Sequence, residues 1–182
     1  MKTITVKDLM VPLDEYATVP REATLREAIL ALEKAQKSLD PTRHKHRAIL
    51  VLDASGKVVG KITMKHILIA LEPNYGKVEG TGVLERSGYS PDLIRSMLEN
   101  NALWTEPLQF FRERAAKLKV GDLIHAPSED EYINENATLG EAIHQMIVNP
   151  YLSLLVTSGD EVLGILRLSD VFTKISDVIK GN

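Results

Sequence analysis

The stretch Ala48–Leu71, AILVLDASGKVVGKITMKHILIAL, predicts a β-hairpin followed by a helix and decides the fold of the chain. Ile49–Leu52 is a β-branched and aliphatic run, and the turn residues after it include Gly56. Lys57–Ile62 is the returning strand. Thr63 then supplies an N-cap oxygen, and aliphatic residues at helical spacing follow it.

The same unit returns near the C-terminus as Leu152–Lys174, LSLLVTSGDEVLGILRLSDVFTK. Upstream, Thr24–Ile29 (TLREAI) matches Thr138–Ile143 (TLGEAI) 114 positions later, and each begins with a capping box. The glycines of the returning strands, Gly60 and Gly164, lie only 104 positions apart, so the first copy has ten additional residues. Each copy exposes an apolar sheet face too small to be stable alone, so we expect the two copies to pack with pseudo-twofold symmetry.

The sequence predicts three parts: a first repeat over 1–71, a helical insertion over 72–118 and a second repeat over 119–182. Ser90–Asp92 is a capped helix start with proline at the first helical position, and Thr105–Pro107 opens a second helix. The insertion also holds the only tryptophan, Trp104. Two interpretations of the insertion remain open: helices that pack on the repeats or on a second copy of the chain, and a lid or partner-docking element that responds to ligand.

Composition and charge exclude several classes of protein. The 182 residues carry a formal net charge of −3, whereas general nucleic-acid binders have a basic excess. The chain has no cysteine, which excludes disulfides, thiolate nucleophiles and cysteine-ligated zinc. We find no signal-peptide core, no apolar run of about 18 residues, no catalytic constellation and no metal-ligand spacing. We therefore expect a cytoplasmic protein that neither spans a membrane nor acts as an enzyme.

The double pattern VxDLM…TVPxxATLxEAI…ILVLDxxGxVVGxIT resembles a tandem pair of cystathionine-β-synthase-type (CBS) domains, the Bateman module. The resemblance covers about 3–71 and 119–178. It implies an α/β fold of two β-α-β-β-α repeats and a homodimer. It also implies a regulatory module that needs no cofactor, binds an adenine nucleotide (AMP, ADP or ATP) between its repeats and passes a conformational change to a regulated protein.

In the resembled family, nucleotide-binding repeats carry the motif Gly-x-hydrophobic-Thr/Ser-x-x-Asp where a strand enters a helix. The glycine allows close approach of a ligand, the polar side chains bind ribose hydroxyls, and the helix N-terminus favours phosphate. Here the first copy, Gly60–His66, has Thr63 but places His66 where the family has Asp. The second copy, Gly164–Asp170, has the Asp but places Arg167 where the family has Thr. The resemblance implies that Asp170 binds ribose. The charge of Arg167 predicts a phosphate contact if its side chain turns into the cleft, and His66 can still hydrogen-bond a sugar, less strongly than a carboxylate.

The resemblance also implies contacts to the base from the extended segment before each first helix and from the start of each hairpin. These positions, together with the hydrophobic residue of each motif, are Thr18, Val19, Pro20, Ala48 and Ile62 in the first repeat, and Tyr132, Ile133, Asn134, Leu152 and Leu166 in the second. The basic run that ends in His46 and Arg47 precedes the first hairpin and predicts either an anion site or a solvated loop.

Other interpretations remain open for the motifs and for the whole protein. Thr63 is equally expected as a plain N-cap, and Asp170 as an acidic residue in a first helical turn. The incomplete motifs favour a ligand-free structural or partner-interaction module. A third alternative is binding of S-adenosylmethionine, or of a nucleic acid through the basic run.

Overall fold

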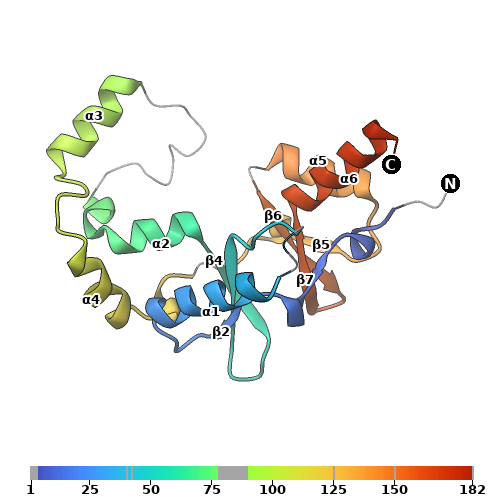
Figure 1. The fold of residues 1–182 in the computed structure, drawn as a ribbon, viewed down its shortest axis with the longest axis horizontal. Coiled ribbons are helices and arrows are strands. Elements are labelled where there is room, and N and C mark those ends of the chain that lie inside the picture. The colour runs from blue at the N-terminus through green and yellow to red at the C-terminus, as the bar shows by residue number, and fades with distance from the viewer. Residues whose placement is uncertain are drawn as a thin grey trace.

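The structure is a computed structural model that describes residues 4–39, 41, 43–77, 90–124, 126–149 and 151–181. One sheet contains, in spatial order, β2 (Thr18–Pro20), β3 (Ala48–Leu52) and β4 (Val58–Thr63), and the other contains β1 (Val11–Pro12), β7 (Glu161–Arg167), β6 (Ser153–Ser158) and β5 (Tyr132–Asn134) (Figure 1). The α-helices are α1 (Leu25–Ser38), α2 (Met64–Leu71), α3 (Pro91–Asn100), α4 (Gln109–Lys117), α5 (Leu139–Val148) and α6 (Leu168–Lys180). Short 3-10 helices are η1 (Val6–Asp8), η2 (Leu13–Glu15), η3 (Pro73–Lys77), η5 (Val120–Asp122) and η6 (Glu129–Glu131).

The predicted α/β fold with two similar repeats is confirmed. In the first repeat β2 runs parallel to β3 and β3 antiparallel to β4, and β5, β6 and β7 repeat this pairing. The register shifts between Val51 and Leu52 in β3 and at the matching point of β6. Gly56 and Gly159 turn the two hairpins with φ of +83° and +58°, a backbone region that favours glycine.

The predicted helix caps are also confirmed. The Thr24 side chain accepts a hydrogen bond from the Glu27 amide, and the Glu27 carboxylate accepts one from the Thr24 amide. The same reciprocal pair begins α5, and Thr63 begins α2 with His66 in the position of the glutamate. These caps fix the residue at which each helix leaves its sheet.

Strands β3 and β6 are buried on both faces. Ile49 and Val51 of β3 pack in one cluster with apolar residues of α1 and α2. Leu50, on the opposite face, packs against Leu155 of β6 in a second cluster that lies between the two sheets. Leu154 of β6 faces α5 and α6 in a third. This layering explains why both strands are continuous apolar runs and do not alternate with polar residues.

The segment that precedes each repeat in the sequence packs into the core of the other repeat, so the two lead segments are exchanged. Val6 lies in the core of the second repeat, and its amide donates to the carbonyl of Ala137 at 2.9 Å. Val120 lies in the core of the first repeat, and its amide donates to the carbonyl of Ala23 at 2.9 Å. Strand β1 joins the edge of the second sheet beside β7. The division into 1–71, 72–118 and 119–182 remains a proposal about the sequence, because each core takes its lead segment from the other part of the chain.

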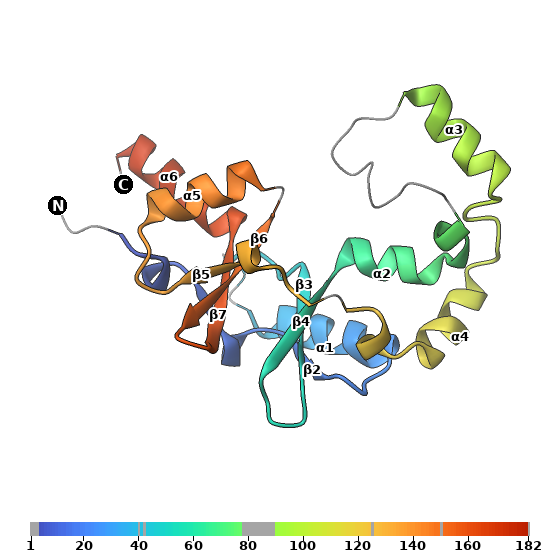
Figure 2. The same cartoon turned by 180° about the vertical axis from the view of Figure 1, so that it is seen from behind.

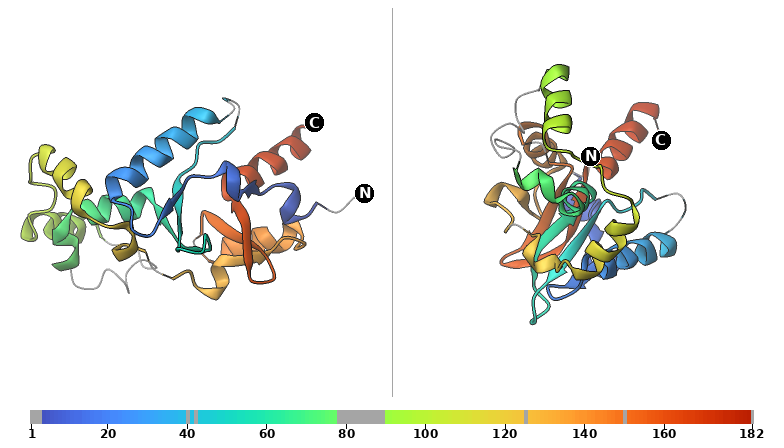
Figure 3. Two further views of the ribbon diagram at one scale, coloured as in Figure 1. Left: turned by 90° about the horizontal axis from the view of Figure 1, so that it is seen from below. Right: turned by 90° about the vertical axis from the view of Figure 1, so that its left-hand side faces the viewer.

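The insertion contains the predicted helices, but only one of them packs on a repeat. Ala115 of α4 is buried in the core of the first repeat, and this helix begins at Gln109, slightly later than the predicted opening at Thr105–Pro107. Helix α3 begins after the predicted cap Ser90 and has no buried residue. Seen from either side, α3 stands away from the two sheets (Figures 1 and 2). Figure 3 places the insertion at the opposite end of the molecule from α6.

Gly164 is required by the exchange of the lead segments. A Cβ atom at this position would lie 2.2 Å from the carbonyl oxygen of Val11 and 3.1 Å from Cα of Pro12. The backbone that approaches this glycine closely is therefore β1, its partner in the sheet. Contact of Gly164 with a ligand remains a prediction.

We predict that Gly164→Ala lowers the free energy of unfolding by about 1–3 kcal/mol, because the new methyl group forces β1 away from β7. Gly140→Ala is the control, since a Cβ there meets only Thr138 Oγ1 at 3.9 Å. Alanine in this first helical turn leaves stability unchanged or raises it by up to about 1 kcal/mol. Urea denaturation of both variants measures the difference, and equal effects would contradict the proposed role of β1.

Candidate functional site

The two strand-to-helix junctions that carry the divided motif each contact the opposite repeat. We call them junction A, formed by Tyr16, His44, His46, Arg167 and Asp170, and junction B, formed by Lys61, Thr63, His66, Glu131, Tyr151 and Ser153. Each therefore combines side chains that are more than 60 positions apart in the sequence.

Arg167 is the centre of junction A. Its residue is 5% exposed, and its guanidinium binds Asp170 through two hydrogen bonds, Nη2 to Oδ1 at 2.6 Å and Nε to Oδ2. Nη1 reaches across to the first repeat, where it donates to the His44 carbonyl at 2.7 Å and lies 3.2 Å from His46 Nδ1. One arginine thus joins the motif carboxylate of the second repeat to the basic run of the first.

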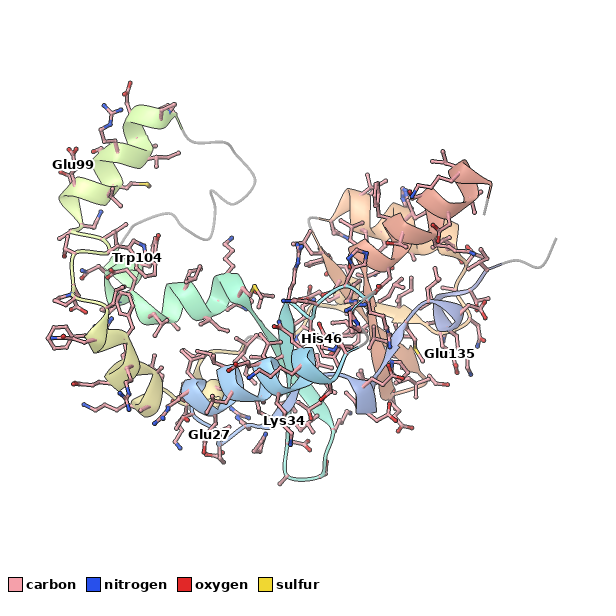
Figure 4. The ribbon with its side chains drawn as sticks, in the orientation of Figure 1. Glu27, Lys34, His46, Glu99, Trp104 and Glu135 are labelled. Carbon is pink, nitrogen blue, oxygen red and sulfur yellow. The ribbon has the colours of Figure 1, made fainter. Side chains whose placement is uncertain are left out.

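The hydrogen bonds assign the tautomer of His46. Arginine only donates, so Nδ1 of His46 is the acceptor, and the proton lies on Nε2, which donates to the Glu15 carbonyl at 3.1 Å. Burial and the nearby charge of Arg167 both lower the pKa of His46. The imidazole is therefore neutral near pH 7, with both nitrogens bonded, and Figure 4 places it between the two repeats.

Tyr16 covers the other side of His46, with the two ring centroids 4.1 Å apart. Burial raises the pKa of Tyr16 to about 12, although the positive charge of Arg167 acts in the opposite direction. The phenol therefore stays protonated at physiological pH. Within junction A, the charges of Arg167 and Asp170 neutralise each other.

The basic run before β3 is a contact between repeats. His44 Nε2 lies 2.8 Å from Thr173 Oγ1 of α6 in the second repeat, whereas Arg43 forms an ion pair within the first repeat, with Glu15 at 2.6 Å. Neither of the two predictions for this run, an anion site or a solvated loop, included these protein contacts. Arg47 is exposed, and its carbonyl accepts a hydrogen bond from the Met64 amide at 3.2 Å.

A cavity of about 550 Å³ lies beside junction A, between α1 and the segment before β2. This volume falls in the range of about 300–1,000 Å³ typical of small-molecule sites. Its lining combines two acidic and two basic side chains with small apolar ones, and consists of Asp14, Glu15, Tyr16, Ala17, Thr18, Ala31, Lys34, Ala35, Ser38, Leu39 and Arg43.

Junction B is held by Lys61. Its ammonium group forms an ion pair with Glu131 at 2.6 Å, donates to the Ser153 carbonyl at 3.0 Å and lies 5.6 Å from the centre of the Tyr151 ring. The Thr63 hydroxyl accepts from the His66 amide at 3.3 Å, so Thr63 is the N-cap that the simpler interpretation predicts. Capping by Thr63 does not exclude ligand binding.

The structure does not bring all the predicted site residues together in one place. Arg167, Asp170 and His46 meet at junction A, whereas Thr63 and His66 lie at junction B. Four predicted residues have side chains in the cores between each sheet and its own helices: Val19, Ile62, Ile133 and Leu166. Pro20, Asn134 and Leu152 are exposed, Ala48 and Gly60 are buried, and Thr18 and Tyr132 are half-buried. Ligand contact at these positions remains a prediction.

Sequence reasoning missed Tyr16, Lys61 and Glu131. Tyr16 stands two residues before the predicted contact Thr18, and Lys61 occupies an unspecified position inside the motif. A polar residue inside an otherwise apolar returning strand was the available signal for Lys61. Glu131 belongs to the acidic run Glu129–Glu131, and a run of this kind indicates only a solvent-exposed turn.

Within the described part of the chain, no three His, Asp or Glu side chains are arranged to hold a metal ion. None of the helices described is long and apolar enough to cross a membrane.

Comparison with known proteins identifies the repeats. A family model described as "CBS domain" matches residues 6–73 and 120–177. A CBS-pair protein, CBSX2 from Arabidopsis thaliana, is 19% identical with a TM-score of 0.62, and the match covers 100% of this chain and 99% of that one. A CBS domain-containing protein of unknown function from Bacillus anthracis is 20% identical with a TM-score of 0.60, over 96% and 94% of the two chains.

A further solved structure, CBSX2 in complex with AMP, is 18% identical with a TM-score of 0.58, over 96% of this chain and 97% of that one. At these identities the likeness establishes the fold. No curated protein matches the sequence significantly.

The lowered pKa of His46 predicts a stability that falls on acidification. Below about pH 6.5, His46 binds a proton in the unfolded chain but not in the folded chain, because its pKa is lowered on folding. The free energy of unfolding therefore decreases as the pH falls. In His46→Gln this decrease is shallower, by at most about 1.4 kcal/mol per pH unit. Urea denaturation between pH 5 and 8 measures it, with exposed His144→Gln as the control. Identical pH profiles for wild type and His46→Gln would contradict the assignment.

Proposed function

The chain belongs to the CBS domain family, and on that premise we propose that it is a non-catalytic regulatory protein that binds an adenine nucleotide at junction A. One observation carries the proposal: His46 and Tyr16 of the first repeat converge on Arg167 and Asp170 of the second. The complex of CBSX2 with AMP, a distant structural neighbour, supports the choice of ligand class.

The proposed binding step is an exchange of ion-pair partners. Asp170 now accepts two hydrogen bonds from Arg167. A nucleotide offers a phosphate to Arg167 and ribose hydroxyls to Asp170, so each side chain receives a new partner of suitable chemistry. Arginine binds phosphate and carboxylate with the same two-pronged geometry, so a phosphate can take the place of the Asp170 carboxylate on Arg167.

This exchange links binding to the arrangement of the repeats. The guanidinium that would turn to phosphate also holds the His44 carbonyl of the first repeat at 2.7 Å. A nucleotide therefore binds more tightly to the arrangement in which this bond is released, and its binding shifts the population toward that arrangement. The cavity of about 550 Å³ beside Tyr16 and Thr18 provides room for the base.

The contacts at junction A also rank the alternatives. S-adenosylmethionine carries no phosphate, and its one anionic group, the α-carboxylate, lies close to an ammonium and a sulfonium cation, so it suits Arg167 less well than a nucleotide phosphate does. The basic run receives protein contacts at Arg43, His44 and His46, which reduces its availability to a nucleic acid. The ligand-free partner-interaction module is the stronger rival, because Asp170 already has a partner within the protein.

We predict that calorimetric titration detects saturable binding of one of AMP, ADP or ATP, and that Asp170→Asn weakens it by about 10–100-fold. That range corresponds to the loss of charge-assisted hydrogen bonds to ribose. Asp177→Asn, on the same helix, is the control and leaves the affinity unchanged.

The same titration places the site. If Asp170→Asn has no effect and His66→Ala abolishes binding, the ligand occupies junction B. Absence of binding for all three nucleotides and S-adenosylmethionine would overturn the nucleotide proposal and favour the interaction module.

We also propose that the protein is a homodimer. Helices α5 and α6 expose large apolar side chains that include Ile147 (75%), Phe172 (70%) and Ile179 (79%). Exposed apolar side chains gathered on neighbouring helices mark interaction surfaces. A regulated protein is a second candidate occupant of this surface.

The double variant Phe172→Glu/Ile179→Glu tests the homodimer. Light scattering after gel filtration should give twice 20.2 kDa for the wild type and 20.2 kDa for this variant, because charges replace the apolar contacts. Leu108→Glu, which changes a residue of the insertion that is 78% exposed, is the matched control and stays dimeric. A monomeric wild type at micromolar concentration would contradict the homodimer.

A further inference from the structure

The buried carboxylate of Glu72, the residue that directly follows α2, holds the middle of the insertion against the end of that helix. Glu72 is 2% exposed. Its Oε2 accepts a hydrogen bond from the Trp104 amide at 2.6 Å, and its Oε1 accepts one from the Asn74 amide at 3.0 Å. Burying a carboxylate is unfavourable unless its oxygens are bonded, so the position of Glu72 depends on that of Trp104.

Aromatic rings surround this bond. The Trp104 indole donates to the Tyr75 hydroxyl at 3.1 Å, and its ring meets Phe111 of α4 edge to face, with centroids 5.6 Å apart. The backbone of Trp104 has φ of +59°, which non-glycine residues adopt rarely and only when their surroundings hold them there. We call Glu72, Tyr75, Trp104 and Phe111 the aromatic latch.

Helix α2 begins at junction B, ends at the aromatic latch, and also contacts the chain next to junction A. At its start, the Met64 amide donates to the Arg47 carbonyl, one residue from His46. At its end, the Leu71 carbonyl accepts a hydrogen bond from Arg114 of α4, and Glu72 follows. The helix has only eight residues, or roughly 12 Å, so a shift at one end reaches the other. Figure 4 shows His46 and Trp104 at the two ends of this path.

We propose that the aromatic latch is the output element of the module. Release of His44 by Arg167 moves the strand entry at His46 and Arg47, and the start of α2 follows. The shift draws Glu72 away from the Trp104 amide. Trp104 then leaves its φ of +59°, and α3 and α4 change their position relative to the first repeat. The nature of the input rests on the proposed function, whereas the coupling between α2 and Trp104 does not.

Trp104 is the only tryptophan, so its fluorescence reports on the aromatic latch directly. We expect titration with the bound nucleotide to change the emission with the same midpoint as calorimetry. Glu72→Gln should show the changed emission without ligand, and nucleotide should alter it by less than a third of the wild-type change. Glu99→Gln, at an exposed position of α3, is the control and behaves like wild type.

Hydrogen exchange without ligand separates the two proposals. Glu72→Gln should accelerate exchange of the α2 amides at 67–71 at least several-fold relative to Glu99→Gln. Tyr75→Phe, which removes only the acceptor of the indole, should give a smaller effect in the same direction and serves if Glu72→Gln does not fold. If calorimetry detects no nucleotide binding but Glu72→Gln still accelerates exchange of the α2 amides, the nucleotide proposal is overturned and the coupling between α2 and Trp104 stands. Nucleotide binding with unchanged emission and unchanged exchange overturns the aromatic latch.

Discussion

Strands β3 and β6 have apolar side chains on both faces, and water can be excluded from both only when the two sheets pack together. Leu50 and Leu155 meet in the layer between the sheets, while Ile49 and Leu154 face the helices of their own repeats. This packing fixes the positions of the polar residues of junctions A and B at the edge of the apolar layer. The returning strands end against the opposite repeat, so Arg167 reaches the carbonyl of His44 and Lys61 reaches that of Ser153. The apolar layer thus aligns the polar junctions.

The divided motif takes on a different meaning in this setting. Arg167 stands where the family motif has a hydroxyl. It forms an ion pair with Asp170, the motif carboxylate of the same repeat, and also donates a hydrogen bond to His44 of the other repeat. Arg167 is only 5% exposed, and its charge is stable there because each of the three guanidinium nitrogens has a hydrogen-bond acceptor. The substitution that makes the second copy incomplete as a ligand motif makes it effective as a clamp between repeats. The proposed nucleotide would therefore compete with this clamp for the same two side chains.

Local rules predicted most of the fold. The caps at Thr24 and Thr63 and the turn at Gly56 depend on residues within four positions, and they could be read from the sequence. The candidate site was harder. His46 and Arg167 are 121 positions apart, and nothing in either segment indicates that an arginine will meet a neutral imidazole. The exchange of lead segments and the bond between Glu72 and Trp104 had no local signal either, because packing alone brings these residues together.

The exchanged lead segments have a consequence for how the protein is made. Val11 pairs with Ile165, so β1 leaves the ribosome 154 residues before its partner in β7. At about 5–20 residues per second, this strand waits roughly 8–30 s for its neighbour. The first repeat in turn lacks Val120 until the insertion has been synthesised. The core of the first repeat is complete only once Val120 has been synthesised, and that of the second only once Val171 has, so neither repeat completes its core from its own consecutive stretch of chain.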